Sequence, residues 1–384
     1  MKRILYIQVG SGFLHVNKRV IAELQKHFPK CEIELFDLMP VLKRDLPALT
    51  INGLSVLFEY FGDFITGKKN VLKFKYHFLG TSYLFKYFTR QVVQKTKERA
   101  YDLVFQTQCL CDASASGLPG YIYTDHTNLH NLRYRWTSPA KYLRSSEYVK
   151  LEREAYHNSA GIFVMSENIR NSLITQYGVP PEKITLAYVG SNTTPPSHHS
   201  SEKYRNKNII FVGKDWERKG GPILLAAFEK VLRETPDATL SVLGCSPQVN
   251  LPNCRVFGEV SLEEVAEQYQ HASVFCFPTL REPFGIVYIE AMLNKLPVVT
   301  NNMGAASSLI TERNGFLLEP DPDAYAKVLI DLLKQPELCR AMGEESFRIA
   351  SSYYTWPHVG EVMAGKMKEH FSSPVVTTTV KNVA

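Results

Sequence analysis

The chain has 384 residues, of which 45% are hydrophobic and 21% charged, and its formal net charge at pH 7 is +6. This length predicts two domains, and the composition excludes a largely disordered chain. No run approaches the roughly 18 uncharged apolar residues of a membrane-spanning helix, so we expect a cytoplasmic protein. The seven cysteines are scattered and odd in number, which favours buried free thiols and no metal site.

The first half of the chain alternates short apolar runs with longer amphipathic ones. The apolar runs, which predict buried strands, lie at residues 4–9, 33–36, 103–105, 120–123 and 161–164. Such alternation is typical of an α/β fold with a parallel, doubly wound sheet, also called a Rossmann-like domain. We place this domain at residues 1–190.

The segment 67–99 concentrates the positive charge. It holds nine basic residues and one acid, so its net charge is +8 and the rest of the chain carries −2. Aromatic residues interleave with these cations, a mixture suited to helices on the anionic inner face of a membrane. The cations expected there are Lys73, Lys75, Lys86 and Arg90. Alternatively, the aromatics face the core and the lysines are solvated. No nucleic-acid motif accompanies the segment, so we expect no nucleic-acid partner.

Residues 191–203 are rich in Ser, Thr and Pro and lack a hydrophobic period, so they are predicted to form a linker. The alternation then restarts, with apolar runs at 208–212, 239–243, 254–257, 273–277 and 296–299. A second doubly wound domain is therefore predicted at residues 204–355. Ligands of such sheets bind at the carboxyl ends of the strands, so the face between the domains is a natural cleft for two substrates.

The run 277–292 passes from a strand through a Pro-interrupted loop into a helix that begins near Gly285. Free N–H groups at a helix start bind anions, and the helix dipole strengthens that binding. Glu282 precedes this turn and Glu290 follows it, so one carboxylate can hold sugar hydroxyls and the other ribose hydroxyls. The neighbours of Glu290 are apolar, so its carboxylate requires a hydrogen-bonding partner. The alternative is a pair of surface acids without a ligand.

A second loop, 212–221, follows the first strand of the second domain. Its small residues allow the backbone to approach a ligand, and Lys214, Arg218 and Lys219 offer cations to a diphosphate. An exposed basic turn without a ligand is the alternative.

These elements together resemble the retaining GT-B-fold glycosyltransferases of family 4. The resemblance rests on residues 212–220, on 277–292 with its E-x7-E pattern, and on 296–299, and it covers most of 160–355. It implies two Rossmann-like domains facing a cleft, and transfer of a hexose from a UDP- or GDP-linked sugar with retention of configuration. The acceptor would be a lipid, a glycan or a small molecule.

The resemblance also implies roles for individual residues. Glu282 would contact the hydroxyls of the donor sugar, Glu290 would hold the ribose and Lys219 the diphosphate. Lys214 stands where the family often has Arg. The backbone that would meet sugar and phosphate belongs to Phe284, Gly285 and Ile286. With Lys219 and the helix start stabilising the leaving diphosphate, we expect no metal or other cofactor.

In the first domain, the run 121–127 resembles the strand-end histidine of the family, which places His126 at the donor sugar. Gly12 lies in the first strand–helix turn, where the family commonly has paired glycines near the transferred sugar. A last helix, 356–372, would begin at Trp356 and return towards the first domain.

Two other functions remain open. An NAD-dependent oxidoreductase would use Gly10 and Gly12 with Asp37, but His15 replaces the third glycine of the dinucleotide-binding motif. A non-catalytic sugar-nucleotide-binding protein would bind the donor without transferring its sugar, and the intact candidate catalytic pair argues against it.

Overall fold

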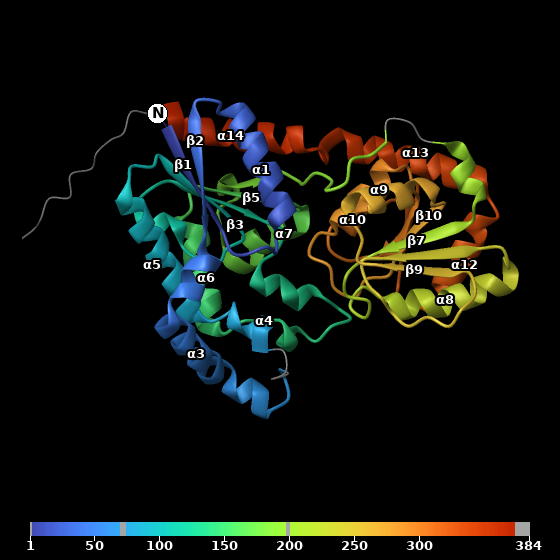
Figure 1. The fold of residues 1–384 in the computed structure, drawn as a ribbon, viewed down its shortest axis with the longest axis horizontal. Helices are drawn as coiled ribbons and strands as arrows, with labels where there is room; N and C mark the ends of the chain where they lie inside the picture. Colours follow the sequence, from blue (N-terminus) through green and yellow to red (C-terminus); the bar gives the residue numbers. More distant parts are fainter. Residues whose placement is uncertain (1, 70–73, 197–199, 373–384) are drawn as a thin grey trace, which may run out of the picture.

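A computed structural model describes residues 2–69, 74–196 and 200–372, which form two lobes (Figure 1). The first sheet contains the strands β1 (Lys2–Gln8), β2 (Cys31–Asp37), β3 (Leu103–Thr107), β4 (Gly120–Thr124), β5 (Gly161–Val164) and β6 (Ile184–Leu186). Its order is β2-β1-β3-β4-β5-β6, and every pair of neighbours is parallel. The helices of this lobe are α1 (Leu14–His27), α2 (Leu38–Arg44), α3 (Leu46–Ile65), α4 (Phe74–Phe78), α5 (Ser82–Glu98), α6 (Ser146–Asn158) and α7 (Glu167–Ser172).

Alternate side chains of β1 show why helices cover both faces of this sheet. Ile4 and Tyr6 join a buried cluster that includes Val20 of α1. Leu5 and Ile7 join a different buried cluster, which includes residues of α2 and α5. Successive side chains of a strand point to opposite faces, so both sides of the sheet must be buried under helices.

The second lobe repeats this arrangement. Its strands are β7 (Asn208–Val212), β8 (Thr239–Leu243), β9 (Cys254–Gly258), β10 (Val274–Phe277), β11 (Val298–Asn301) and β12 (Gly315–Leu318). They form a parallel sheet of order β12-β11-β10-β7-β8-β9. Its helices are α8 (Gly221–Glu234), α9 (Leu262–His271), α10 (Ile286–Leu293), α11 (Ala306–Leu309), α12 (Pro322–Leu333) and α13 (Pro336–Tyr353). The predicted pair of Rossmann-like domains is confirmed.

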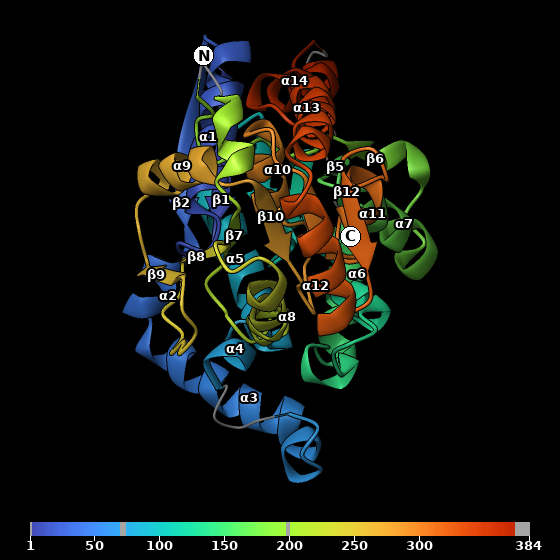
Figure 2. The same ribbon diagram turned by 90° about the vertical axis from the view of Figure 1, so that its right-hand side faces the viewer.

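The last helix, α14 (Trp356–Ser372), runs from the second lobe to the first and packs against α1 (Figures 1 and 2). At its start, Trp356 Nε1 donates a hydrogen bond to the carbonyl of Ser191 at 2.7 Å. Ser191 and Thr193 are buried, so the first residues of the predicted linker are packed into the body of the protein. The domain boundaries themselves stay predictions.

In α5, which belongs to the basic segment, the structure contradicts the membrane interpretation. Phe85, Tyr87 and Phe88 of α5 are buried, because aromatic residues at helical spacing form the inner face of this helix. Lys86 forms an ion pair with Glu147 at 2.8 Å, and Arg90 is exposed. The expectation that these aromatics lie at a membrane surface is therefore wrong for α5. Lys73 lies outside the described residues, and so does the side chain of Lys75.

No helix in the described ranges combines the length and the apolar character needed to cross a membrane.

A substitution at Gly190 tests the contact with Trp356 at the start of α14. A Cβ atom added there would lie 2.6 Å from the indole ring of Trp356. Because such overpacking forces side chains or backbone to shift, we expect Gly190→Ala to lower the free energy of unfolding by about 1–3 kcal/mol. Thermal melts followed by circular dichroism would measure the effect. Gly365→Ala in α14 is the control, since a Cβ atom there meets nothing within 4 Å. Equal melting temperatures for both variants would contradict this packing argument.

Candidate functional site

The loop between β10 and α10 is shaped by Gly285. This residue has a left-handed backbone with φ of 92°, and a Cβ atom there would lie 2.4 Å from the Tyr288 ring. Glycine is therefore required at this turn. The turn leads into α10, whose first N–H groups have no partner within the helix and so favour an anion. Phe284 is buried, so its side chain is part of the core.

Glu282 in this loop forms an ion pair with Lys219, which follows β7. The two side chains are only 9% and 12% exposed. The ammonium of Lys219 also lies 5.0 Å from the centre of the Phe277 ring. Burial lowers the pKa of Lys219, and the charge of Glu282 partly opposes that effect. The predicted sugar acid and the predicted diphosphate cation thus contact each other.

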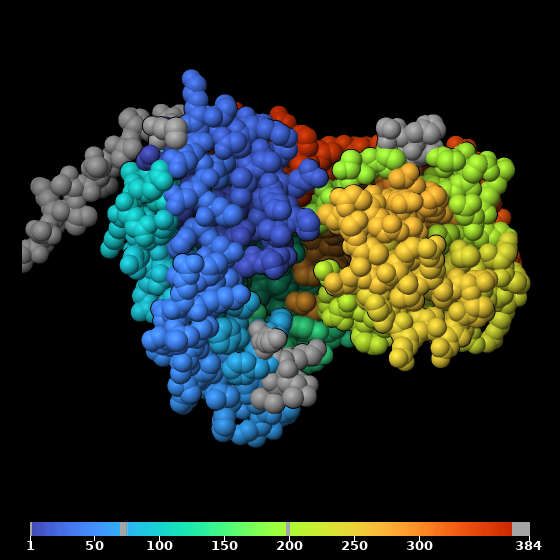
Figure 3. All heavy atoms as spheres, viewed as in Figure 1, coloured from blue at the N-terminus to red at the C-terminus, as the bar shows by residue number. Residues whose placement is uncertain are grey.

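A cavity of about 740 Å³ extends from this ion pair, in the groove between the lobes (Figure 3). Gly213, Gly244 and Phe277 line it, and they lie at or just after the carboxyl ends of β7, β8 and β10. This is where ligands of parallel sheets bind. The three predicted diphosphate cations, Lys214, Arg218 and Lys219, also line it, although Lys214 is 82% exposed and lies 3.6 Å from Glu259.

Glu290 closes the far side of this cavity. Its side chain is buried, and the Tyr269 hydroxyl donates a hydrogen bond to it at 3.4 Å. Burial raises the pKa of Glu290 to about 7, against the effect of the Asn192 backbone N–H and of Tyr269. The required hydrogen-bonding partner of this carboxylate is thus Tyr269.

Asn192 is a cavity residue that was not among the predicted site residues. It lines the same cavity as Glu290, and its Oδ1 is buried without a hydrogen-bond partner in the part of the chain that the structure describes. An unpartnered buried oxygen is available to a ligand. The only sequence signal was its place in the run 189–192, directly after the last strand of the first domain.

His126 lies under a contact that joins the two lobes. Arg281 donates to Asn131 Oδ1 at 2.9 and 3.1 Å, and its guanidinium lies 4.2 Å from the centre of the Tyr142 ring. The His126 ring stacks on Tyr134, which Arg281 also contacts. Both ring nitrogens of His126 are buried, and neither forms a hydrogen bond of normal geometry with a described residue.

The histidine ring is held neutral. Burial, reinforced by the cation of Arg281, lowers the pKa of His126 well below its usual value. His126 does not line the cavities that border Lys219 and Glu282, because the interlobe contact encloses it in this conformation.

Asp125, beside His126, was also not predicted. Gln108 donates a hydrogen bond to its carboxylate at 2.9 Å. Burial and, to a smaller extent, the charge of Glu282 in the other lobe raise the pKa of Asp125 to about 6.

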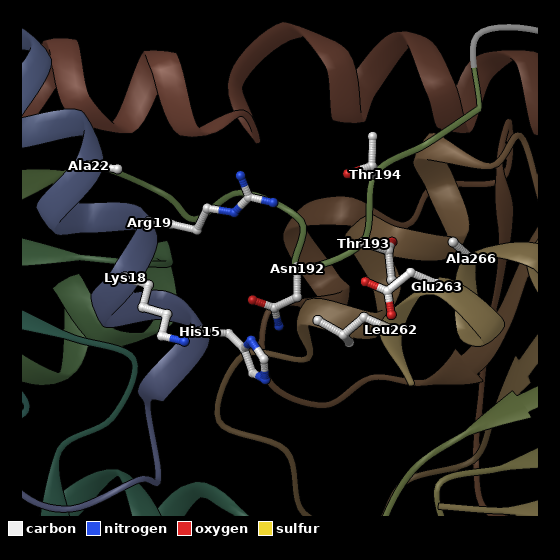
Figure 4. Close-up of a pocket in the computed structure, with 10 residues that line it drawn as sticks. All are labelled: His15, Lys18, Arg19, Ala22, Asn192, Thr193, Thr194, Leu262, Glu263 and Ala266. Carbon is white, nitrogen blue, oxygen red and sulfur yellow. The ribbon is translucent and has the colours of Figure 1, made fainter. Parts of the chain in front are cut away.

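Gly12 is not brought to any described cavity. It is exposed, and a Cβ atom there would contact nothing within 4 Å. The first turn of α1 contributes His15 instead, which lines the 740 Å³ cavity and a second one of about 590 Å³ between α1 and α9. Figure 4 shows this second cavity, with Lys18 and Arg19 on one side and Glu263 on the other.

The carboxylate of Asp37 is occupied by the local backbone. It accepts hydrogen bonds from the N–H groups of Gly10 and Met39 at 2.9 and 3.0 Å, and from the side chain of Gln8 at 3.0 Å. A dinucleotide-binding enzyme would need this acid for the ribose hydroxyls. The structure therefore does not favour the NAD-dependent alternative.

Two protein-family models match consecutive parts of the chain. The model described as Glycosyltransferase Family 4 matches residues 60–194, and the model described as Glycosyl transferases group 1 matches residues 195–348. D-inositol 3-phosphate glycosyltransferase from Corynebacterium kroppenstedtii is 27% identical over 233 residues, which cover 53% of this chain and 52% of that protein. The chain thus spans about half the length of this curated relative.

Two solved structures share the fold. Sucrose-phosphate synthase from Thermosynechococcus elongatus superposes with a TM-score of 0.68 at 15% identity, over 97% of this chain and 100% of that chain. Anabaena HepE, solved in complex with UDP and glucose, superposes with a TM-score of 0.64 at 15% identity, over 96% and 100% of the two chains.

The raised pKa of Glu290 predicts how stability depends on pH. The folded protein binds this proton more tightly than the unfolded chain, whose glutamate pKa is 4.5, so the free energy of unfolding falls as the pH rises from 4.5 to about 7. Urea unfolding at several pH values would measure this fall. We expect the free energy of unfolding of Glu290→Gln to fall less steeply with pH. Part of the fall should remain, because burial also raises the pKa of Asp125 to about 6 and that of Glu152 to about 7. Glu312→Gln, at an exposed position, is the control. An unchanged slope in Glu290→Gln would contradict the assignment.

Proposed function

Because the chain belongs to the GT-B glycosyltransferases of the family-4-like type, we propose that it transfers a hexose from a UDP- or GDP-linked sugar with retention of configuration. The buried Lys219–Glu282 ion pair beside the start of α10 carries this proposal. It provides one group for the diphosphate and one for the sugar at the same point of the cleft. The complex of HepE with UDP and glucose supports a UDP-linked hexose.

The donor occupies the 740 Å³ cavity in this proposal. Glu290 and Asn192 bind the ribose, and Lys214 and Lys219 bind the diphosphate. The backbone from Phe284 to Ile286 meets sugar and phosphate, because α10 begins directly after the left-handed turn at Gly285 and a helix start favours an anion. The proposal omits Gly12, because the first turn of α1 contributes His15 to the donor cavity instead.

Donor binding exchanges the partners of the ion pair. When a diphosphate oxygen takes the place of Glu282 beside Lys219, the ammonium keeps an anionic partner and the carboxylate becomes available to the sugar hydroxyls. The exchange limits the desolvation cost, since neither buried charge is left unpaired. His126, which is neutral, offers a ring nitrogen to another sugar hydroxyl once the contact between Arg281 and Asn131 opens.

Transfer then breaks the bond between the anomeric carbon and the diphosphate oxygen. The acceptor hydroxyl attacks the same face of the sugar and forms the new glycosidic bond, and the leaving phosphate takes the hydroxyl proton. Lys219 and the start of α10 stabilise the negative charge that develops on the diphosphate. The proposal needs no metal or other cofactor, since these groups supply the positive potential.

The acceptor, which we propose to be a lipid, a glycan or a small molecule, enters from the first lobe. A cavity of about 540 Å³ borders the ion pair on that side. Its lining includes Tyr76, His77, Lys141, Tyr142, Arg281 and Glu282. This placement lets the acceptor hydroxyl reach the sugar without crossing the donor cavity.

Removing either member of the ion pair should abolish transfer. We expect Lys219→Ala and Glu282→Ala to lower the rate of nucleotide release from the donor by at least about 100-fold, because each removes a group that stabilises the transition state. Lys230→Ala, which breaks the more exposed ion pair with Asp323, is the matched control and should turn over like the wild type. Circular dichroism would verify that each variant is folded. Turnover at the wild-type rate in either site variant would refute the site.

A panel of nucleotides separates the candidate functions. We expect UDP- or GDP-sugars to raise the melting temperature in a thermal-shift assay, because a ligand that binds only the folded state stabilises it. NAD should cause no shift, since Asp37 is already occupied. A shift with NAD alone would instead support the oxidoreductase. A shift with a nucleotide sugar, without nucleotide release in the presence of any acceptor, would support the non-catalytic binding protein.

A further inference from the structure

Helix α3 presents an apolar face to solvent. Half of the exposed large hydrophobic side chains of the described residues lie on this one helix: Leu46, Ile51, Leu54, Leu57, Phe58, Phe61 and Ile65. Their exposed fractions run from 45% for Leu57 to 83% for Phe58. At 3.6 residues per turn they occupy one arc of about 140°, which we call the apolar face of α3.

The opposite side of the same helix faces the protein, and Ala48, Asn52, Val56 and Tyr60 are buried there. Glu59 accepts hydrogen bonds from Ser82 at 2.8 Å and from Ser145 at 2.6 Å. Asn52 donates to the Phe78 carbonyl at 2.8 Å. A surface helix of a globular protein normally buries its apolar side and exposes its polar side. Helix α3 instead buries one apolar side and exposes a second one, which water does not favour.

The charges around the apolar face are cationic. Lys43 and Arg44 are exposed just before its first turn, and Lys68 is exposed just after its last. The nearby acids point elsewhere: Asp45 caps α3 and accepts from Tyr87, and Asp63 pairs with Lys69. An apolar strip therefore lies between cations at both ends.

We propose that the apolar face of α3 docks the protein on an anionic phospholipid bilayer. Apolar and aromatic side chains of an interfacial helix enter the boundary between headgroups and acyl chains, and cations beside it contribute about 1 kcal/mol each through anionic lipids. Docking covers the exposed apolar surface and gives the flanking cations partners of opposite sign.

A second copy of this chain fits the face less well. A two-fold interface would bring the same surface together with itself, so cations of one copy would face cations of the other. Among the described residues, the acids of α3 and of its N-cap are already bound inside their own subunit, so they do little to offset that repulsion. An anionic surface meets no such cost.

The position of α3 links docking to the cleft. In both views α3 lies at one end of the first lobe, far from α14 (Figures 1 and 2). It packs against α4, whose Tyr76 and His77 line the 540 Å³ cavity beside Glu282. If the proposed function holds, on which this step rests, docking brings the acceptor cavity near the lipid headgroups and makes a lipid-linked acceptor the substrate class.

Co-sedimentation of the full chain with vesicles tests the docking surface. We expect the wild type to sediment with phosphatidylcholine vesicles that contain about 30% phosphatidylglycerol. Phe58→Glu/Phe61→Glu should lower the partition coefficient at least about tenfold, because two apolar side chains no longer leave water. Lys43→Glu/Arg44→Glu/Lys68→Glu should weaken binding only to the anionic vesicles. The matched control, Leu35→Glu/Tyr353→Glu, changes two exposed hydrophobic residues elsewhere and should bind like the wild type.

Either of two results would overturn the docking proposal: a wild type that stays in the supernatant, or Phe58→Glu/Phe61→Glu binding like the wild type. A concentration-dependent dimer that this variant abolishes, without any vesicle binding, would also overturn the proposal, since a second copy would then cover the face.

The affinity for the donor is measured separately, by calorimetric titration. The donor affinity of Phe58→Glu/Phe61→Glu should equal that of the wild type, because α3 lines no part of the donor cavity. Vesicle binding without donor binding in the wild type would reject the proposed function and leave the docking surface intact.

Discussion

The buried ion pair between Lys219 and Glu282 is the contact on which the arrangement of the cleft depends. It ties the loop after β7 to the loop after β10, and one glycine after β7 and another after β11 allow close packing against the β10 loop. A Cβ atom at Gly220 would lie 1.8 Å from the Pro278 carbonyl oxygen, and one at Gly304 would lie 2.4 Å from that of Glu282. Each buried charge is stabilised mainly by the other, so the ion pair is stable without a ligand. An anionic ligand can then replace Glu282 as the partner of Lys219.

Much of the fold could be predicted from the sequence because buried parallel strands are continuous apolar runs. The strands that were not predicted, β6 and β12, are short and lie at sheet edges, where parts of their side chains remain exposed. Glu282, Glu290 and Lys219 could be predicted because a loop and a helix start place them locally. Asp125 and Asn192 could not, since the burial of Asp125 and the place of Asn192 beside Glu290 arise from tertiary packing that leaves no local pattern.

The two helices α3 and α5 show why an amphipathic pattern cannot assign its own orientation. In α5, basic and aromatic residues alternate as they would at a membrane, yet the aromatics are buried in the core. In α3, one apolar side is buried with Val56 and Tyr60, and a second apolar side is exposed. Periodicity identifies a face, but only tertiary contacts decide what the face meets.

The place of Arg281 in the chain has a mechanical consequence. This residue holds the first lobe through Asn131, while its neighbour Glu282 is held by Lys219 in the second lobe. The two anchors are one peptide unit apart, so a rotation of the lobes that separates Arg281 from Asn131 would act directly on the backbone that positions the Glu282 carboxylate. Such a displacement would reach Glu282 through a single peptide unit, with no intervening element to absorb it.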